Sequence, residues 1–321
     1  MKVALACSGP IRTFNRCYQT WIDNIIIPLE NIIGKGNVKI FMYNSVIDED
    51  FYKTNIENSL FSAKIGTDSS GWKDIIENSP YIEKYIQYTY NNQYIEEIFD
   101  KINTYNKTNY DVYNIKKYEV PVGRKGKKFY PHLITAICLN YNNKKIIDAI
   151  PSEYDIIIKI RPDAYLIKPY PIDKILNMKN NTIYLQAKIS SHNNPSFKLL
   201  NKKYLLGKRW DNFYMGTRST LVQLYNNYFY YCHTILNKFI QKPNKQDKCI
   251  PEYLLQNIII KEKIQSVEFL YHGAADKIFR KINKNQDCWI KFAEENNINW
   301  FVLKNDHQHL INFQRPKIMS K

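Results

Sequence analysis

The segment 154–169 constrains this chain more than any other, because it contains a buried-type strand that ends on charged residues. It reads YDIIIKIRPDAYLIKP, and its apolar run from Ile156 to Ile160 is interrupted only by Lys159. Near-continuous Val/Ile/Leu runs are typical of strands that helices cover on both faces. The segment therefore predicts an internal strand with Arg161-Pro162-Asp163 at its carboxyl end.

The charged pair at this strand end has two interpretations. In open α/β sheets ligands bind beyond the carboxyl ends of the strands, so Asp163 is placed to act on a ligand or a metal ion. Arg161 and Asp163 can equally pair with each other and serve only the structure, because ion pairs of that kind are common. The spacing leaves both interpretations open.

The N-terminal part of the chain follows a strand-loop-helix-strand pattern. We expect a buried strand over 2–7, broken by Ser8-Gly9-Pro10, then a helix over about 12–33 and a second strand over 38–43. A parallel, nucleotide-binding sheet begins in this way. The sequence therefore predicts an α/β fold.

The rest of the chain shows no linker and no internal repeat, so we expect one domain over 1–321. Within it we expect a core over 1–230, a helical insertion near 45–115 over the sheet edge, and a C-terminal helical extension over 231–321. The pattern further predicts helices over 72–88, 93–105, 131–150, 172–178, 221–239 and 251–261, and strands over 182–187, 210–216 and 267–271. Thr217 or Ser219 is expected to cap the helix at 221.

The chain is basic, with a formal charge of +16 over 321 residues. This charge favours anionic ligands such as nucleotides, acidic glycans or a membrane surface. The lysines are spread along the chain and no nucleic-acid-binding motif is present, so no specific nucleic-acid partner is expected. One basic loop, 123–128, contains Lys127; it is either an anion-seeking element or an ordinary solvated turn.

The cysteines and the hydropathy indicate where the protein functions. The six cysteines are scattered without C-x-x-C or metal-ligand spacing, which indicates free thiols in a reducing compartment. No apolar stretch approaches the about 18 residues that a membrane helix needs. We therefore expect a soluble, cytoplasmic protein without a transmembrane segment.

Four groups of polar residues fall at predicted strand ends or strand-to-helix turns. They are Ser8-Gly9-Pro10 with Arg12, Arg161 with Asp163, Asp211 before a glycine turn, and His272. Because the carboxyl ends of parallel strands meet at one edge of a sheet, we expect these groups to converge in one cleft.

Three sequence blocks resemble a glycosyltransferase-like family found in bacteria and large DNA viruses. The blocks are ALACSGPIRTFNRCYQTWIDNIIIPL, with its Ser-Gly-x-x-Arg, YDIIIKIRPDAYLIKP, with its Arg-x-Asp strand end, and WDNFYMGTRSTLVQLYN. Their order and spacing agree with the family over roughly residues 1–230. For a viral protein, the expected compartment would be the host cytoplasm.

The resemblance implies a GT-A-type fold, a Rossmann-like α/β/α sandwich with a mostly parallel central sheet. It also implies a UDP- or GDP-linked sugar donor and a hydroxyl acceptor on a glycan or glycoconjugate. Such enzymes usually hold Mn²⁺ or Mg²⁺ with Asp-x-Asp, which here would make Asp163 a metal ligand, with His272 as a second candidate. The second carboxylate is missing because Tyr165 occupies its position, so cationic side chains are the alternative to a metal.

The same resemblance suggests roles for the other candidate residues. The predicted catalytic carboxylates are Asp211, as a general base or near the anomeric carbon, and Asp163. A simple capping role for Asp211 and a solvated position for Arg12 remain alternatives. The loss of the second carboxylate also leaves open a non-catalytic module that binds nucleotides or polyanions. The predicted donor-binding residues are Ser8, Gly9, Pro10, Arg12, Arg161 and Lys127.

Overall fold

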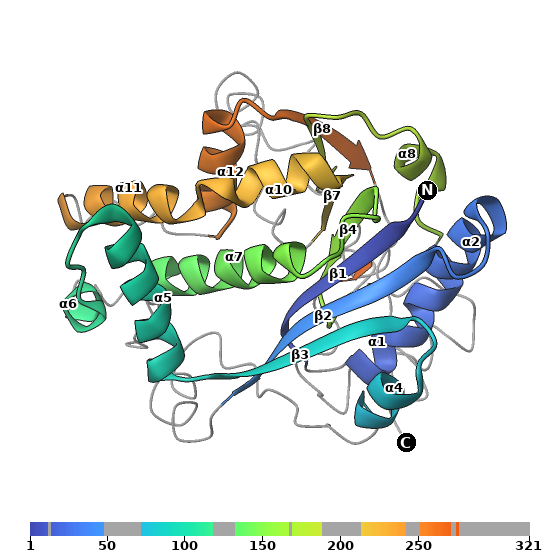
Figure 1. Ribbon diagram of the computed structural model, residues 1–321, viewed down its shortest axis with the longest axis horizontal. Coiled ribbons are helices and arrows are strands. Elements are labelled where there is room, and N and C mark those ends of the chain that lie inside the picture. Colours follow the sequence, from blue (N-terminus) through green and yellow to red (C-terminus); the bar gives the residue numbers. More distant parts are fainter. Residues whose placement is uncertain are drawn as a thin grey trace, which may run out of the picture.

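Seven strands form a central mixed sheet, and helices cover both of its faces (Figure 1). In spatial order the strands are β3 (Ile82–Tyr90), β2 (Val38–Ile47), β1 (Val3–Pro10), β4 (Ile156–Ile160), β7 (Tyr214–Thr217), β6 (Thr182–Ala187) and β8 (Gln265–Leu270). The computed structural model describes residues 1–11, 14–47, 72–117, 132–166, 169–187, 213–241, 251–270 and 274–275.

The sheet is mostly parallel, as the sequence predicts. Every neighbouring pair runs parallel except the two that involve β7, which is antiparallel to both β4 and β6. A second, smaller sheet pairs β5 (Tyr165–Leu166) with β9 (Ala274–Ala275) in antiparallel orientation. The predicted α/β class is confirmed.

The two faces of the sheet carry separate apolar clusters, because successive side chains of a strand point to opposite faces. On β1, Ala4 and Ala6 face one cluster, and Val3, Leu5 and Cys7 face the other. The first cluster is completed by α5 (Asn92–Asn106), α6 (Val112–Lys117), α7 (His132–Asp148), α10 (Arg218–Asn226), α11 (Tyr228–Gln241) and α12 (Pro251–Lys261). The second is completed by α1 (Phe14–Trp21), η1 (Ile22–Ile26), α2 (Ile27–Ile33), α4 (Trp72–Asn78) and α8 (Ile172–Leu176). The molecule is therefore an α/β/α sandwich.

Most predicted elements are present, with two informative differences. The helix expected over 12–33 contains a π-helical turn, η1, which ends two residues before Pro28, a residue that cannot donate a helical hydrogen bond. The helix expected over 72–88 is wrong: α4 ends at Asn78, and after Pro80 the chain forms β3 at the sheet edge. The β-branched and aromatic residues of β3 fit a half-covered edge strand.

Four of the six cysteines lie in the described residues, and the helices of those residues can be tested for membrane-spanning length. Cys7, Cys17, Cys138 and Cys232 are buried free thiols. Across the described ranges, the helices are too short or too polar to cross a membrane.

Candidate functional site

The strand order reverses between β1 and β4, and two predicted groups lie at this point. From β1 the chain adds β2 and β3 on one side and then returns to place β4 on the other side. Ligands of open α/β sheets bind beyond the carboxyl ends of the strands at such a reversal. Ser8-Gly9-Pro10 ends β1, and Arg161-Pro162-Asp163 follows β4. The structure thus brings these two groups to neighbouring strand ends.

The last three residues of β1 pair with β2 and not with β4. Its pairing with β4 stops at Cys7 opposite Ile160, whereas its pairing with β2 continues from Ser8 through Pro10. The expectation that Gly9 and Pro10 break the strand is therefore wrong, because both remain in the ladder with β2. Gly9 has φ +114, and a Cβ added to it would meet no described atom within 4 Å. The backbone at Gly9 therefore has open space beside it, as close approach of a ligand requires.

Replacing Gly9 by Ala is expected to cost about 1 to 3 kcal/mol of unfolding free energy, because L-residues rarely adopt its positive φ. Gly36 is the positive control, because it also has a positive φ, +84, and a Cβ added to it would meet no described atom within 4 Å. Urea denaturation should show a loss in both Gly9→Ala and Gly36→Ala. A Gly9→Ala variant as stable as the unmodified protein would contradict this account of the backbone.

A β-turn brings the two charged side chains at the end of β4 together. The Ala164 N–H donates to the Arg161 carbonyl at 3.1 Å, and Pro162 occupies the second position of the turn, which favours proline. Arg161 Nε donates to Asp163 Oδ1 at 2.8 Å, and Arg161 Nη2 donates to Asp163 Oδ2 at 2.9 Å. The pairing of Arg161 with Asp163, which the sequence left open, is therefore formed. It is bidentate, the geometry in which arginine–carboxylate hydrogen bonds are strong.

The helical segment after β1 holds this turn in place. The Trp21 indole N–H donates to the Ala164 carbonyl at 2.5 Å. Thr20 Oγ1 accepts from the Leu166 N–H at 3.0 Å, and Asn24 Nδ2 donates to the Leu166 carbonyl at 3.1 Å. These bonds fix the chain that follows the Arg161–Asp163 pair against the helix that follows β1.

Two buried asparagines near Ser8 and Gly9 were not among the predicted site residues. Ser8 Oγ donates to Asn143 Oδ1 at 2.5 Å, and Asn44 Nδ2 donates to the Gly9 carbonyl at 2.7 Å. Asn143 Nδ2 and Asn44 Oδ1 have no hydrogen-bond partner within the described part of the chain. Such groups are costly and call for an explanation such as a bound molecule. Asn44 follows a predicted strand directly, so the rule that identified Ser8 could also have identified Asn44.

Tyrosines continue this polar region between β2, β3 and the helices. Tyr88 stacks on Tyr43 and on Tyr94, with ring centroids 4.6 and 4.5 Å apart. Asn142 accepts from the Tyr94 hydroxyl and donates to the Tyr88 hydroxyl, each at 2.5 Å. Burial raises the pKa of Tyr88 and of Tyr94 above the usual range, so both phenols remain protonated donors. They are therefore unsuited to act as general bases.

Two further groups beside the strand ends are fully buried. Burial raises the pKa of the Cys7 thiol to about 12, although the nearby Lys159 charge opposes the shift. Cys7 is therefore not a nucleophile at neutral pH. Lys159, which interrupts the apolar run of β4, is 0% exposed and interacts with neighbouring groups. In the sequence, Lys159 appears only as an interruption of the apolar run, so it was not among the predicted site residues.

The remaining predicted site residues lie outside the described residues. They are Arg12, Lys127, Asp211 and His272. Their convergence with the β1 and β4 ends stays a prediction.

The described donor set does not fit the divalent cation that the sequence resemblance implies. Mg²⁺ and Mn²⁺ prefer octahedral oxygen sites, to which a protein commonly contributes one or two carboxylates beside substrate phosphates and waters. Both oxygens of the candidate carboxylate, Asp163, already accept hydrogen bonds from Arg161. Position 165 carries tyrosine in place of a second carboxylate. In the described ranges, no three His, Cys, Asp or Glu side chains are grouped so that they could hold a metal.

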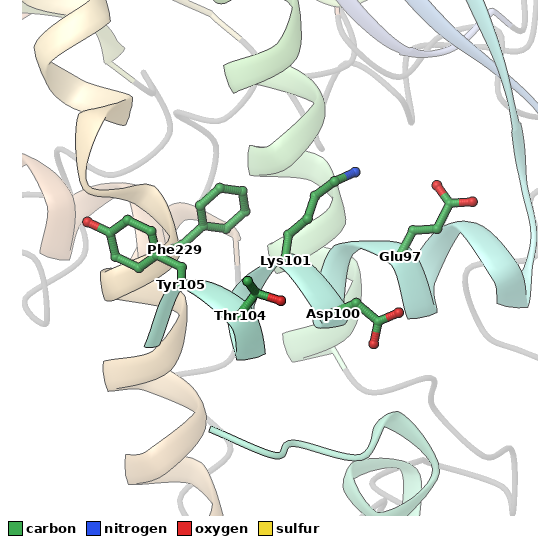
Figure 2. A pocket seen from close by; sticks show the side chains of 6 residues that line it. All are labelled: Glu97, Asp100, Lys101, Thr104, Tyr105 and Phe229. Carbon is green, nitrogen blue, oxygen red and sulfur yellow. The ribbon is translucent and has the colours of Figure 1, made fainter. Parts of the chain in front are cut away.

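A separate hollow of about 550 Å³ lies between α5 and α11 (Figure 2). Lys101 belongs to its wall and donates from Nζ to the Tyr141 hydroxyl at 3.0 Å. None of the predicted site residues lines this hollow, so it is distinct from the strand ends. The lining residues are Glu97, Asp100, Lys101, Thr104, Tyr105 and Phe229.

Comparisons with known proteins add little to this picture. No protein-family model and no curated protein matches the chain. Among solved structures, the chain is similar to the crystal structure of mouse xyloside xylosyltransferase 1 in its apo form. The identity is 7%, the TM-score is 0.38, and the match covers 84% of each chain. At these values the likeness carries no argument about function.

Proposed function

We propose that this protein is a glycosyltransferase that moves a sugar from a UDP- or GDP-linked donor to a hydroxyl of a glycan or glycoconjugate. The observation that carries the proposal is the neighbouring position of Ser8-Gly9-Pro10 and Arg161-Pro162-Asp163 at the reversal of the strand order. Doubly wound sheets bind nucleotides at this point. The choice of a sugar nucleotide rests on the three sequence blocks that resemble glycosyltransferases.

The chemistry explains why cations and carboxylates would be required. In the net reaction the acceptor oxygen bonds to the anomeric carbon, and the bond from that carbon to the diphosphate oxygen breaks. The electron pair of the broken bond stays on the nucleoside diphosphate, whose growing charge a cationic side chain would stabilise. The acceptor hydroxyl loses its proton to a base, and Asp211 is our candidate for this base.

A thermal-shift screen of UDP-, GDP-, ADP- and CMP-linked sugars tests the donor. We expect a UDP- or GDP-sugar to stabilise the protein by about 2.7 kcal/mol at a hundred times its dissociation constant, because ligands that bind the native state raise its stability. No shift with any nucleotide or nucleotide sugar would overturn the donor assignment. Asp211→Asn should keep the shift and abolish sugar transfer, measured as release of the nucleoside diphosphate with an acceptor present.

A non-catalytic module that binds nucleotides or polyanions is the second candidate. The observation that favours it is Tyr165 at the position of the second carboxylate. This candidate predicts binding of UDP or GDP without any release of diphosphate from the sugar nucleotide. Transfer by the unmodified protein that Asp211→Asn abolishes would exclude it.

A further inference from the structure

We propose that Arg161, oriented by Asp163, supplies the positive charge that binds the donor diphosphate, and that this binding needs no divalent cation. The inference rests on the proposed function, because it concerns the nucleotide diphosphate of the same site. It makes Arg161 a binding residue and Asp163 a positioning residue, in place of the metal ligand that the sequence resemblance suggests.

The first argument is the geometry of the pair. Both oxygens of Asp163 accept hydrogen bonds from the same guanidinium, at 2.8 and 2.9 Å. The Asp163 side chain is 2% exposed, whereas the Arg161 side chain is 14% exposed. A ligand that reaches this strand end therefore meets the cation more readily than the carboxylate. The carboxylate fixes the guanidinium plane, so that less side-chain freedom is lost on binding.

The second argument is the local charge. Over residues 159–163 the chain carries two cations, Lys159 and Arg161, against one carboxylate, Asp163. Lys159 belongs to β4 and Arg161 directly follows it; burial raises the pKa of the neighbouring Cys7 thiol, and the positive charges of both side chains act to lower it. A divalent cation placed at Asp163 would be repelled by both and would have to displace Arg161 from a carboxylate oxygen. A diphosphate would be attracted by the same charges.

The third argument is chemical and steric fit. A guanidinium offers parallel N–H donors that match two oxygens of a phosphate group. The neighbouring strand end presents Gly9, beside which an added Cβ would meet no described atom within 4 Å. Ser8, in β1, and Arg161, after β4, are the next residues beyond the Cys7–Ile160 pair, so this backbone and Arg161 continue two adjacent, in-register chains. A phosphate could therefore meet the guanidinium and the backbone at one strand edge.

Calorimetric titration of the full chain with UDP and with GDP tests the inference. Each nucleotide is titrated in excess EDTA and, separately, in excess Mn²⁺. We expect the nucleotide that binds to bind at least as tightly in EDTA as in Mn²⁺, because Mn²⁺ bound to the diphosphate lowers the negative charge that Arg161 attracts. Arg161→Met should weaken binding of this nucleotide by about tenfold to a hundredfold, the change in affinity expected for the loss of a hydrogen bond to a charged group.

Further variants distinguish a loss of nucleotide binding from a loss of folding. Arg161→Met removes two hydrogen bonds to the buried Asp163 carboxylate, which can affect folding. The double variant Arg161→Met with Asp163→Leu is therefore measured as well and should also lose binding. Asp163→Asn keeps the arginine and should bind more weakly than the unmodified protein, and again at least as tightly in EDTA as in Mn²⁺. The matched control is Arg218→Met, which removes an arginine whose backbone N–H bonds to Asp155, at the opposite end of β4. It should bind like the unmodified protein.

The outcomes separate this inference from the proposed function. Binding that requires Mn²⁺ and disappears in EDTA would overturn the inference and leave the proposed function standing. Unchanged affinity in Arg161→Met and in the double variant would overturn it as well. Failure of UDP, GDP and every sugar nucleotide in both conditions would overturn the proposed function and the inference together.

Discussion

The Trp21→Ala variant is expected to lose about 3 to 5 kcal/mol of unfolding free energy, the usual cost of removing a large buried aromatic side chain. Trp21 is 0% exposed and packs edge-on against Phe14, with ring centroids 5.4 Å apart. Its indole N–H also donates to the Ala164 carbonyl, so the variant would release the turn that carries Arg161 and Asp163. Urea denaturation followed by far-UV circular dichroism measures the loss.

A second buried tryptophan provides the control for the hydrogen bond. Trp72 is 6% exposed, and its indole nitrogen has no partner within the described ranges. Trp21→Phe and Trp72→Phe remove similar volume, but the first also leaves the Ala164 carbonyl without its donor. We expect Trp21→Phe to cost about 1 to 3 kcal/mol more than Trp72→Phe. Equal costs would show that the Trp21 N–H does not stabilise the turn.

The Asp163→Ala variant is expected to lose about 3 to 5 kcal/mol of unfolding free energy, because it removes one partner of a buried ion pair and both hydrogen bonds of that pair. The Asp163 side chain is 2% exposed and carries both hydrogen bonds from Arg161. Replacing both partners, as Arg161→Met with Asp163→Leu, should recover most of the loss, because apolar pairs of similar volume are tolerated. Urea denaturation of the single and double variants measures both effects.

An exposed ion pair on α7 is the matched control. Lys144 and Asp148 are four residues apart with N–O 2.6 Å, and the Asp148 side chain is 45% exposed. Asp148→Ala should therefore cost no more than about 0.5 kcal/mol. An equally small cost for Asp163→Ala would mean that the Arg161–Asp163 pair contributes little to folding. A large cost would make Asp163→Asn the better variant for binding studies.

The elements with a local signal were predictable from the amino-acid sequence. The apolar run of β4 and its charged end were predictable, because an aliphatic run broken only by Lys159 and followed by a proline turn has few other interpretations. The helix expected over 131–150, observed as α7, was predictable because apolar residues at helical spacing indicate one buried face. β3 was missed because it is an edge strand, and its half-exposed pattern does not distinguish strand from helix.

Which of these groups meet depends on contacts between residues far apart in the sequence. Ser8 and Asn143 are 135 residues apart, and Trp21 and Ala164 are 143 residues apart, so neither contact leaves a local trace. The same holds for β7, whose antiparallel direction depends on its neighbours β4 and β6. Even Arg161 and Asp163, two residues apart, were undecided until burial of the carboxylate made its pairing with the guanidinium necessary.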